Sequence, residues 1–94
     1  PVKDEESSVE GKSVILTCSY ETSYTHPALH WYRHDSDLQA PQFILWKGAK
    51  DYSGYEYIPD KRYGSQTSPT TTNLTITALT LADTALYYCA LETQ

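Results

Sequence analysis

The sequence lacks the features that mark membrane-spanning and nucleic-acid-binding chains. No apolar run approaches the roughly 18–20 residues that a helix needs to cross a bilayer. Basic residues are also few, because 7 Lys and Arg stand against 12 Asp and Glu and give a formal net charge of −5. Such an acidic chain is a poor candidate for binding nucleic acid or anionic membrane surfaces. We therefore expect no nucleic-acid partner and no direct membrane contact.

Catalytic and metal-binding signatures are absent as well. The chain has no GxSxG, HExxH, GxGxxG or phosphate-binding loop. His26, His30 and His34 recur every four residues, but in a strand and loop that spacing does not bring ligands together. We predict no catalytic residue, no metal site and no cofactor, so the chain is expected not to be an enzyme. The absence of a signal peptide leaves a cytosolic chain or an already processed product.

Cysteine is scarce, and the two that occur lie far apart, at Cys18 and Cys89. Neither belongs to a CxxC or CxxH spacing, which argues against zinc. A disulfide between them would close most of the chain and stabilise the fold by about 4 kcal/mol on a chain-entropy estimate. It would also imply an oxidising, extracellular setting. Two buried free thiols are the alternative reading of the spacing.

The hydrophobic pattern has a period of two residues, which is the period of a β-strand. Val14, Leu16 and Cys18, for example, share one face, while Ile15 and Thr17 share the other. Strands of this kind are predicted over residues 13–20, 28–34, 42–47, 73–79 and 84–91. Residues 46–65 mix Gly, Pro, Tyr and charge and are predicted as a break, and only residues 80–83 could form a helical turn. Short strands between turn clusters predict a single all-β domain over residues 1–94, a sandwich or a barrel.

One constellation is specific. Trp31 lies between the two cysteines, and Asp83, Ala85, Tyr87 and Cys89 form a D-x-A-x-Y-x-C pattern. Together these residues resemble the immunoglobulin variable-type domain over essentially the whole chain. The resemblance implies a V-type, two-sheet Greek-key sandwich in which a Cys18–Cys89 disulfide packs on Trp31. It also implies a tyrosine corner at Tyr87 and, across the bottom of the sandwich, an ion pair between Asp83 and Arg62. The alternative for Arg62 is a solvated surface charge.

Within variable domains, WYRH, APQFILW and ALYYCAL are most similar to the T-cell receptor variable domain of the alpha or delta type. Antibody light chains usually read WYQQ at the tryptophan, and a light-chain-like domain is an alternative. A V-set cell-surface receptor or adhesion module that binds through its sheet face is another. The FGxG motif of a joining segment does not occur, so we expect the last strand of the sandwich to be missing or incomplete.

The resemblance implies two binding surfaces on the extracellular part of a plasma-membrane receptor. One is a sheet face that pairs with a second variable domain, beta for an alpha chain or gamma for a delta chain. Alternation directs three residues of this face away from the core, and the resemblance adds two more; the set is Tyr32, His34, Tyr88, Pro41 and Phe43. Family members often have Gln at the His34 position, where two glutamines bond across the dimer axis. The alternative to a pairing surface is that the tyrosines only favour strand formation and expose their hydroxyls to water, and that His34 is solvated.

The second surface is formed by three loops, which resemble the hypervariable loops: residues 21–27, residues 47–54 and the stub after Cys89. By resemblance their ligand is a peptide–MHC or MHC-like surface. The candidate contact residues are Tyr24, Thr25, His26, Lys50, Asp51, Tyr52, Leu91 and Glu92. Tyr57 is expected to support the second loop. Asn73-Leu74-Thr75 is an acceptor sequence for N-linked glycans, and Asn73 is expected to face outward from its strand.

Overall fold

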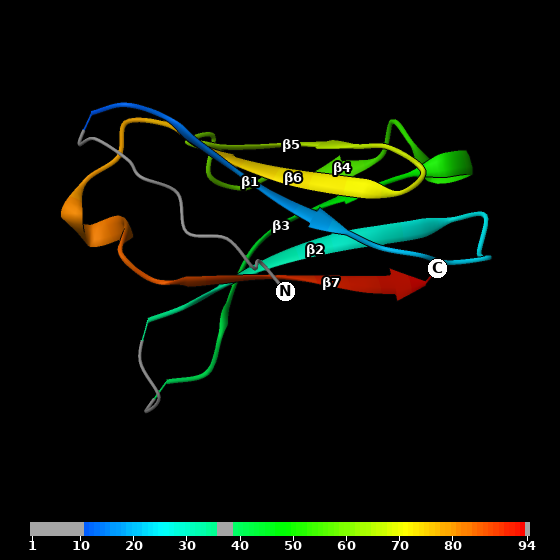
Figure 1. The fold of residues 1–94 in the computed structure, drawn as a ribbon, viewed down its shortest axis with the longest axis horizontal. Helices are drawn as coiled ribbons and strands as arrows, with labels where there is room; N and C mark the ends of the chain where they lie inside the picture. The colour runs from blue at the N-terminus through cyan, green and yellow to red at the C-terminus, as the bar shows by residue number, and fades with distance from the viewer. Residues whose placement is uncertain (1–10, 36–38, 94) are drawn as a thin grey trace.

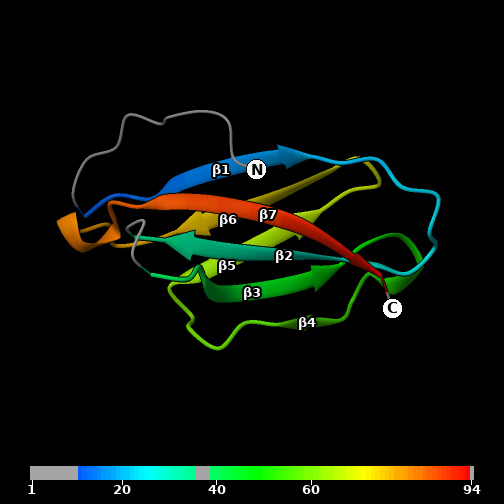
Figure 2. The ribbon, with the colours of Figure 1, turned by 90° about the horizontal axis from the view of Figure 1, so that it is seen from below.

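The computed structural model describes residues 11–35 and 39–93, which form two antiparallel sheets packed face to face (Figure 1). The three-stranded sheet has the order β1 (Val14–Ser19), β6 (Thr71–Ile76), β5 (Tyr63–Thr67). The four-stranded sheet has the order β4 (Glu56–Tyr57), β3 (Gln42–Gly48), β2 (Pro27–His34), β7 (Leu86–Thr93), and Figure 2 shows these strands side by side. The all-β sandwich predicted from the sequence is confirmed.

Alternation along the strands builds the core between the sheets. In β6, Thr72, Leu74 and Ile76 are buried, while the residues between them are partly exposed. Trp31 of β2 is fully buried, with an exposed fraction of 0%. Burying one large apolar side chain stabilises a fold by roughly 1.5–3 kcal/mol, so this core is the main source of stability. Its members are Leu16, Cys18, Trp31, Ile44, Leu45, Leu74, Ile76, Leu79 and Tyr87.

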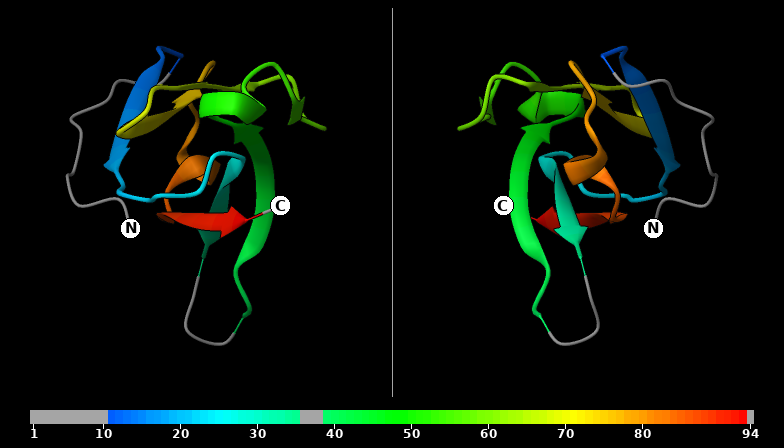
Figure 3. Two further views of the ribbon diagram at one scale, coloured as in Figure 1. Left: turned by 90° about the vertical axis from the view of Figure 1, so that its right-hand side faces the viewer. Right: turned by 90° about the vertical axis from the view of Figure 1, so that its left-hand side faces the viewer.

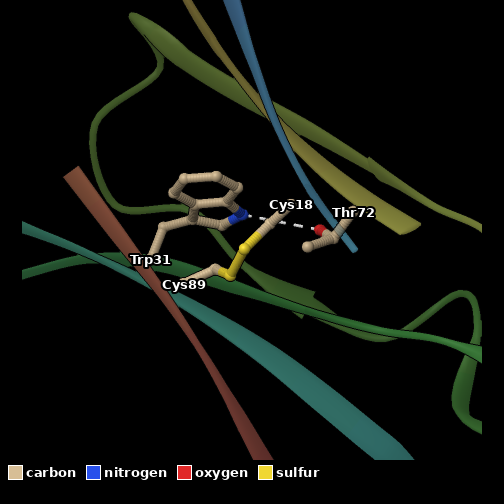
Figure 4. The surroundings of a disulfide bond; sticks show 4 residues. All are labelled: Cys18, Trp31, Thr72 and Cys89. Carbon is tan, nitrogen blue, oxygen red and sulfur yellow. Dashed lines mark hydrogen bonds between the residues drawn. A yellow bond between two sulfur atoms is a disulfide. The ribbon is translucent and has the colours of Figure 1, made fainter. Parts of the chain in front are cut away.

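The predicted disulfide is present and joins the two sheets. Cys18 reaches from β1 in the three-stranded sheet to Cys89 of β7 in the four-stranded sheet (Figure 4). Trp31 lies beside the bridge, and its indole Nε1 donates to the Thr72 hydroxyl at 3.4 Å. The indole N–H, which would otherwise be buried without a partner, is thereby satisfied.

A charged cluster closes one end of the sandwich. The side chain of Asp83, only 5% exposed, accepts a hydrogen bond from Arg62 Nη2 at 2.7 Å, and Arg33 Nη1 lies 3.6 Å from its other oxygen. The hydrogen bond from Arg62 lowers the pKa of Asp83. Tyr87 donates its hydroxyl to the Asp83 carbonyl at 2.6 Å, which is the geometry of a tyrosine corner. Burial raises the pKa of Tyr87 to about 12.

Arg33 is a member of this cluster that the sequence reasoning did not identify. Its position two residues after Trp31 directs it inward, where a charge requires partners. Besides Asp83, it contacts the Asp35 carboxylate at 2.6 Å and donates to the Ala82 carbonyl. An inward-facing arginine in an alternating strand was therefore a signal that a partner carboxylate exists elsewhere in the chain.

The prediction of an uninterrupted break over residues 46–65 was wrong. β4 and the first residues of β5 lie within it, as does η1, a 3₁₀ turn over Lys50–Tyr52. Both strands are at sheet edges, and pairing with β3 and β6 supplies order that their own residue pattern does not indicate. The helical turn predicted at residues 80–83 is η2, Leu81–Asp83, where Thr80 and Asp83 form a capping box.

Candidate binding surfaces: an aromatic sheet face and the loop end

Seven ring side chains cover the outer surface of the four-stranded sheet. Its strand register brings them together: Tyr32 of β2 lies opposite Tyr88 of β7 and Phe43 of β3, and His30 lies opposite Trp46. Because side chains on one sheet face alternate, all of these point away from the core. We call this set the aromatic face; its members are His30, Tyr32, His34, Phe43, Trp46, Tyr57 and Tyr88.

The rings of the aromatic face contact one another across the strands. Phe43 is central: its ring centroid lies 5.8 Å from that of His30 and 6.0 Å from that of Tyr32, both edge to face, and 6.0 Å from the stacked ring of Tyr57. His30 in turn stacks on Trp46 at 6.2 Å. Such pairs each contribute roughly 0.5–1.5 kcal/mol beyond the area that they bury. The face is therefore an ordered surface before anything binds it.

Much of this surface is nevertheless open to solvent. Phe43 is 39% exposed and Tyr57 is 55% exposed, and Leu86, opposite His34 at one margin, is 60% exposed. Pro41, just before β3, is exposed too. A contiguous apolar patch with a few polar atoms at its margin is typical of a surface that another protein covers.

His30 and Trp46 belong to this face although the sequence analysis did not select them. His30 alternates with Tyr32 and His34, so its place was readable from the sequence. Burial among the neighbouring rings lowers the pKa of His30, opposed by the nearby Glu92 carboxylate. The imidazole is therefore neutral at neutral pH.

His34 is held by its own hairpin. Its Nε2 lies 3.0 Å from the Gln39 carbonyl oxygen. Since a carbonyl only accepts, Nε2 carries the hydrogen, and in the neutral ring Nδ1 is the acceptor that can face a partner. The His34 ring also lies 6.2 Å from the Tyr88 ring. His34 can thus offer a partner one acceptor rather than the paired donor and acceptor of a glutamine.

The first two predicted loops lie at one end of the sandwich, opposite η2, and β7 ends beside them (Figures 1 and 3). We call this region the loop end. Its first two loops are directly bonded: Asp51 N donates to the Thr25 carbonyl at 2.9 Å, and Ala49 N donates to the Pro27 carbonyl at 3.1 Å. The two loops thus form one surface.

Stacked rings link the loop end to the aromatic face. Trp46 stacks on Tyr52 with centroids 5.6 Å apart and nearly parallel planes, and Tyr52 stacks on Tyr55 at 4.9 Å. His26 approaches Tyr52 at 6.1 Å. Tyr55 is 60% exposed and Tyr24 is 58% exposed. Tyr52 therefore supports the loop end, whereas the rings of Tyr24 and Tyr55 are open to solvent.

Lys50, one of the candidate contact residues, joins the first loop to the second. Its ammonium group donates to the Thr22 carbonyl at 2.7 Å. Its backbone has a φ of 53°, in the left-handed region. Asp51, the next residue, is exposed, as are Thr25, Leu91 and Glu92. The exposed charges of the loop end are therefore carboxylates.

Gly48 fixes the start of the second loop. A Cβ placed on it would lie 2.7 Å from Cδ2 of Tyr52 and closer still to the Tyr52 carbonyl oxygen. Its N–H donates to the Tyr55 carbonyl at 2.9 Å, and its carbonyl accepts from the Thr67 hydroxyl at 2.8 Å. Only glycine permits this approach of the backbone to the turn that carries the stacked tyrosines.

The chain has no helix among residues 11–35 and 39–93 that is long and apolar enough to cross a membrane. Within the same residues no group of three or more His, Cys, Asp or Glu side chains could hold a metal ion.

Comparison with known proteins identifies the family. The model of the immunoglobulin V-set domain matches residues 2–94. The chain is 32% identical over 85 residues to T cell receptor alpha variable 14/delta variable 4 of Homo sapiens, covering 88% of this chain and 70% of that protein. It is 35% identical over 85 residues to T cell receptor alpha variable 17, with the same coverage.

A beta-chain relative is similar to the same degree. T cell receptor beta variable 5-5 of Homo sapiens is 35% identical over 80 residues, which cover 85% of this chain and 68% of that protein. T-cell receptor variable domains are receptor domains and not enzymes, so the expectation that this chain has no catalytic activity is supported. The chain belongs to the immunoglobulin V-set family, among the T-cell receptor variable domains.

Proposed function

We propose that the chain is the antigen-recognition variable domain of an extracellular T-cell receptor chain of the alpha or delta type. It pairs through the aromatic face with a second variable domain, of the beta or gamma type, and binds a peptide–MHC or MHC-like surface through the loop end. The observation that carries the proposal is the continuous array of rings that links an open sheet face to the two bonded loops.

The proposed pairing has a physical basis in the composition of the aromatic face. Phe43 and Tyr57 expose apolar surface that a partner would remove from water, and Phe43 already contacts three ring neighbours that hold it in place. Ordered aromatic anchors lose little side-chain entropy on binding and often dominate an interface. At the margin, His34 supplies an acceptor for a partner donor.

The proposed ligand binding rests on the loop end. Tyr24 and Tyr55 offer large exposed rings with few rotatable bonds, and Asp51 and Glu92 add negative charge. Because backbone hydrogen bonds join the two loops, the surface requires little ordering on binding. We therefore expect a ligand that presents donors and basic groups toward these carboxylates.

Co-expression with beta and gamma variable domains tests the class and the partner. Stable complex formation with a beta domain supports an alpha chain, and complex formation with a gamma domain supports a delta chain. If neither domain associates and the chain instead pairs with alpha domains, the chain is of the beta type and the proposal is wrong in this respect.

Loop variants separate this function from that of a V-set adhesion module. Tyr55→Ala removes an exposed ring of the loop end and is expected to weaken ligand binding while leaving domain pairing unchanged. The exposed aromatic face itself supports the second candidate, in which the sheet binds the ligand. If Phe43→Ala abolishes ligand binding by the isolated domain and Tyr55→Ala does not, the adhesion module is correct.

A further inference from the structure

Asn73 lies near the centre of the outer face of the three-stranded sheet. β6 is the middle strand, and Asn73 alternates with the buried Thr72 and Leu74, so its side chain faces away from the core. It opens the sequence Asn73-Leu74-Thr75, the acceptor pattern for an N-linked glycan. Both the Asn and the Thr of this pattern are on the outer face.

The side-chain amide of Asn73 is held in a defined orientation. Gln66 N, on the neighbouring strand β5, donates to Asn73 Oδ1 at 2.9 Å. Since a backbone N–H only donates, the atom that meets it must be the amide oxygen. Nδ2, the atom that accepts a glycan, is on the other branch of the amide, and none of the described residues accepts a hydrogen bond from it. A glycan on Nδ2 would leave the bond to Gln66 intact.

The surroundings of Asn73 suit a sugar. The outward residues of the three strands carry no charge and most bear hydroxyl or amide groups; they are Ile15, Thr17, Ser19, Gly64, Gln66, Thr71 and Thr75. Gly64 lies beside Thr75 without a side chain, which leaves space above the sheet. Ile15, opposite Thr75, is 54% exposed and is the one large apolar side chain in this set. Sugar hydroxyls and C–H faces match these groups.

We propose that Asn73 carries an N-linked glycan that covers the outer face of the three-stranded sheet and leaves the aromatic face and the loop end open. In the transfer, Nδ2 bonds to the anomeric carbon of a lipid-diphosphate-linked oligosaccharide. The bond from that carbon to the diphosphate oxygen breaks, the lipid diphosphate leaves, and Nδ2 loses one proton. The inference rests on the proposed extracellular placement, because only chains that enter the secretory pathway meet this donor.

The position of the glycan is compatible with the proposed pairing. The two sheets turn their outer faces in opposite directions (Figure 3), so a sugar on the three-stranded sheet does not occupy the surface of the four-stranded sheet. The glycan would instead shield Ile15 and prevent contacts between copies of the chain through this face. The modification would thus restrict association to the aromatic face.

Expression behind a signal peptide in mammalian cells tests the proposal. Both secreted and intracellular pools are treated with peptide N-glycosidase F, which removes the glycan and converts the attached Asn to Asp. We expect a downward mobility shift and conversion at Asn73 in the wild type and in Thr75→Ser, which keeps the acceptor pattern. Asn73→Gln and Thr75→Ala should lose the shift, whereas Thr17→Ala, on the same face and opposite Asn73, should retain it.

Unmodified Asn73 in folded chains from both pools would overturn the inference. Pairing with a second variable domain is measured on the same material. A glycosylated chain that fails to pair would contradict the proposed function and leave the glycan inference standing. A chain that pairs with a second variable domain but carries no glycan on Asn73 would contradict the glycan inference and leave the proposed function standing.

Discussion

Gly48→Ala gives a quantitative test of how the second loop is built. The added Cβ would lie 2.7 Å and 2.9 Å from Tyr52 Cδ2 and C, and even closer to the Tyr52 carbonyl oxygen. Because backbone atoms are involved, the turn over Lys50–Tyr52 must move. Forcing a methyl group into a packed site costs about 1–3 kcal/mol. Weakening the hydrogen bond from Gly48 N to Tyr55 O adds roughly 0.5–1.5 kcal/mol.

We therefore expect Gly48→Ala to lower the free energy of unfolding by about 1.5–4.5 kcal/mol, measured by urea denaturation. The matched control is Gly64→Ala, at which the nearest atom to the new Cβ is Thr75 Cβ, 4.0 Å away. Since Gly64 is a strand residue with open space around it, the control should be neutral or slightly stabilising. Equal stabilities of the two variants would refute the close approach at Gly48.

Three further predictions concern the buried polar groups and His30. Asp83→Asn should lower the free energy of unfolding near pH 7, because Arg62 loses its carboxylate partner. Since the folded pKa of Asp83 is lowered, the stability that its carboxylate contributes is present above the ordinary Asp pKa and is lost as the pH falls through the folded pKa. The difference in unfolding free energy between the wild type and Asp83→Asn should therefore shrink as the pH is lowered in a denaturation series. Tyr87→Phe should cost roughly 1–3 kcal/mol in thermal or urea unfolding, because the Asp83 carbonyl loses a buried donor; an unchanged stability would contradict the tyrosine corner. His30 has a lowered folded pKa, so its contribution is present above its ordinary pKa of 6.5 and is lost as the pH falls through the folded value. His30→Gln should flatten the stability profile between pH 6.5 and the lower folded pKa. An NMR titration that gives an ordinary or raised pKa would contradict the burial.

The parts of the fold that depend on local alternation could be predicted from the sequence. Leu74 and Ile76 in β6 and Cys18 in β1 are buried as their spacing indicates. The strands that were missed, β4 and β5, are edge strands whose order comes from their partners rather than from their own residues. Sequence patterns report which face a residue takes in a strand, but they do not report which distant strand pairs with it.

The residues of the candidate site likewise fall into those that local alternation predicts and those that depend on tertiary contacts. Tyr32 and Tyr88 could be assigned to one face because each alternates with a buried neighbour. The contacts of Gly48 and Lys50 could not be predicted. Gly48 approaches the Tyr52 carbonyl of the next turn, and Lys50 donates to the Thr22 carbonyl of another loop. Tertiary contacts of this kind leave no periodic signal.

The affinity of the chain for a second variable domain tests the central proposal most directly. Phe43→Asp places a charge at the centre of the aromatic face, while Ile15→Asp places one on the outer face of the other sheet at a residue that is also exposed. If the aromatic face is the pairing surface, surface plasmon resonance with the partner domain should show a dissociation constant raised by about 30-fold or more for Phe43→Asp, the effect of losing about 2 kcal/mol at an interface centre. Ile15→Asp should bind as the wild type does. Equal affinities for the wild type and Phe43→Asp, with both variants folded, would contradict the account.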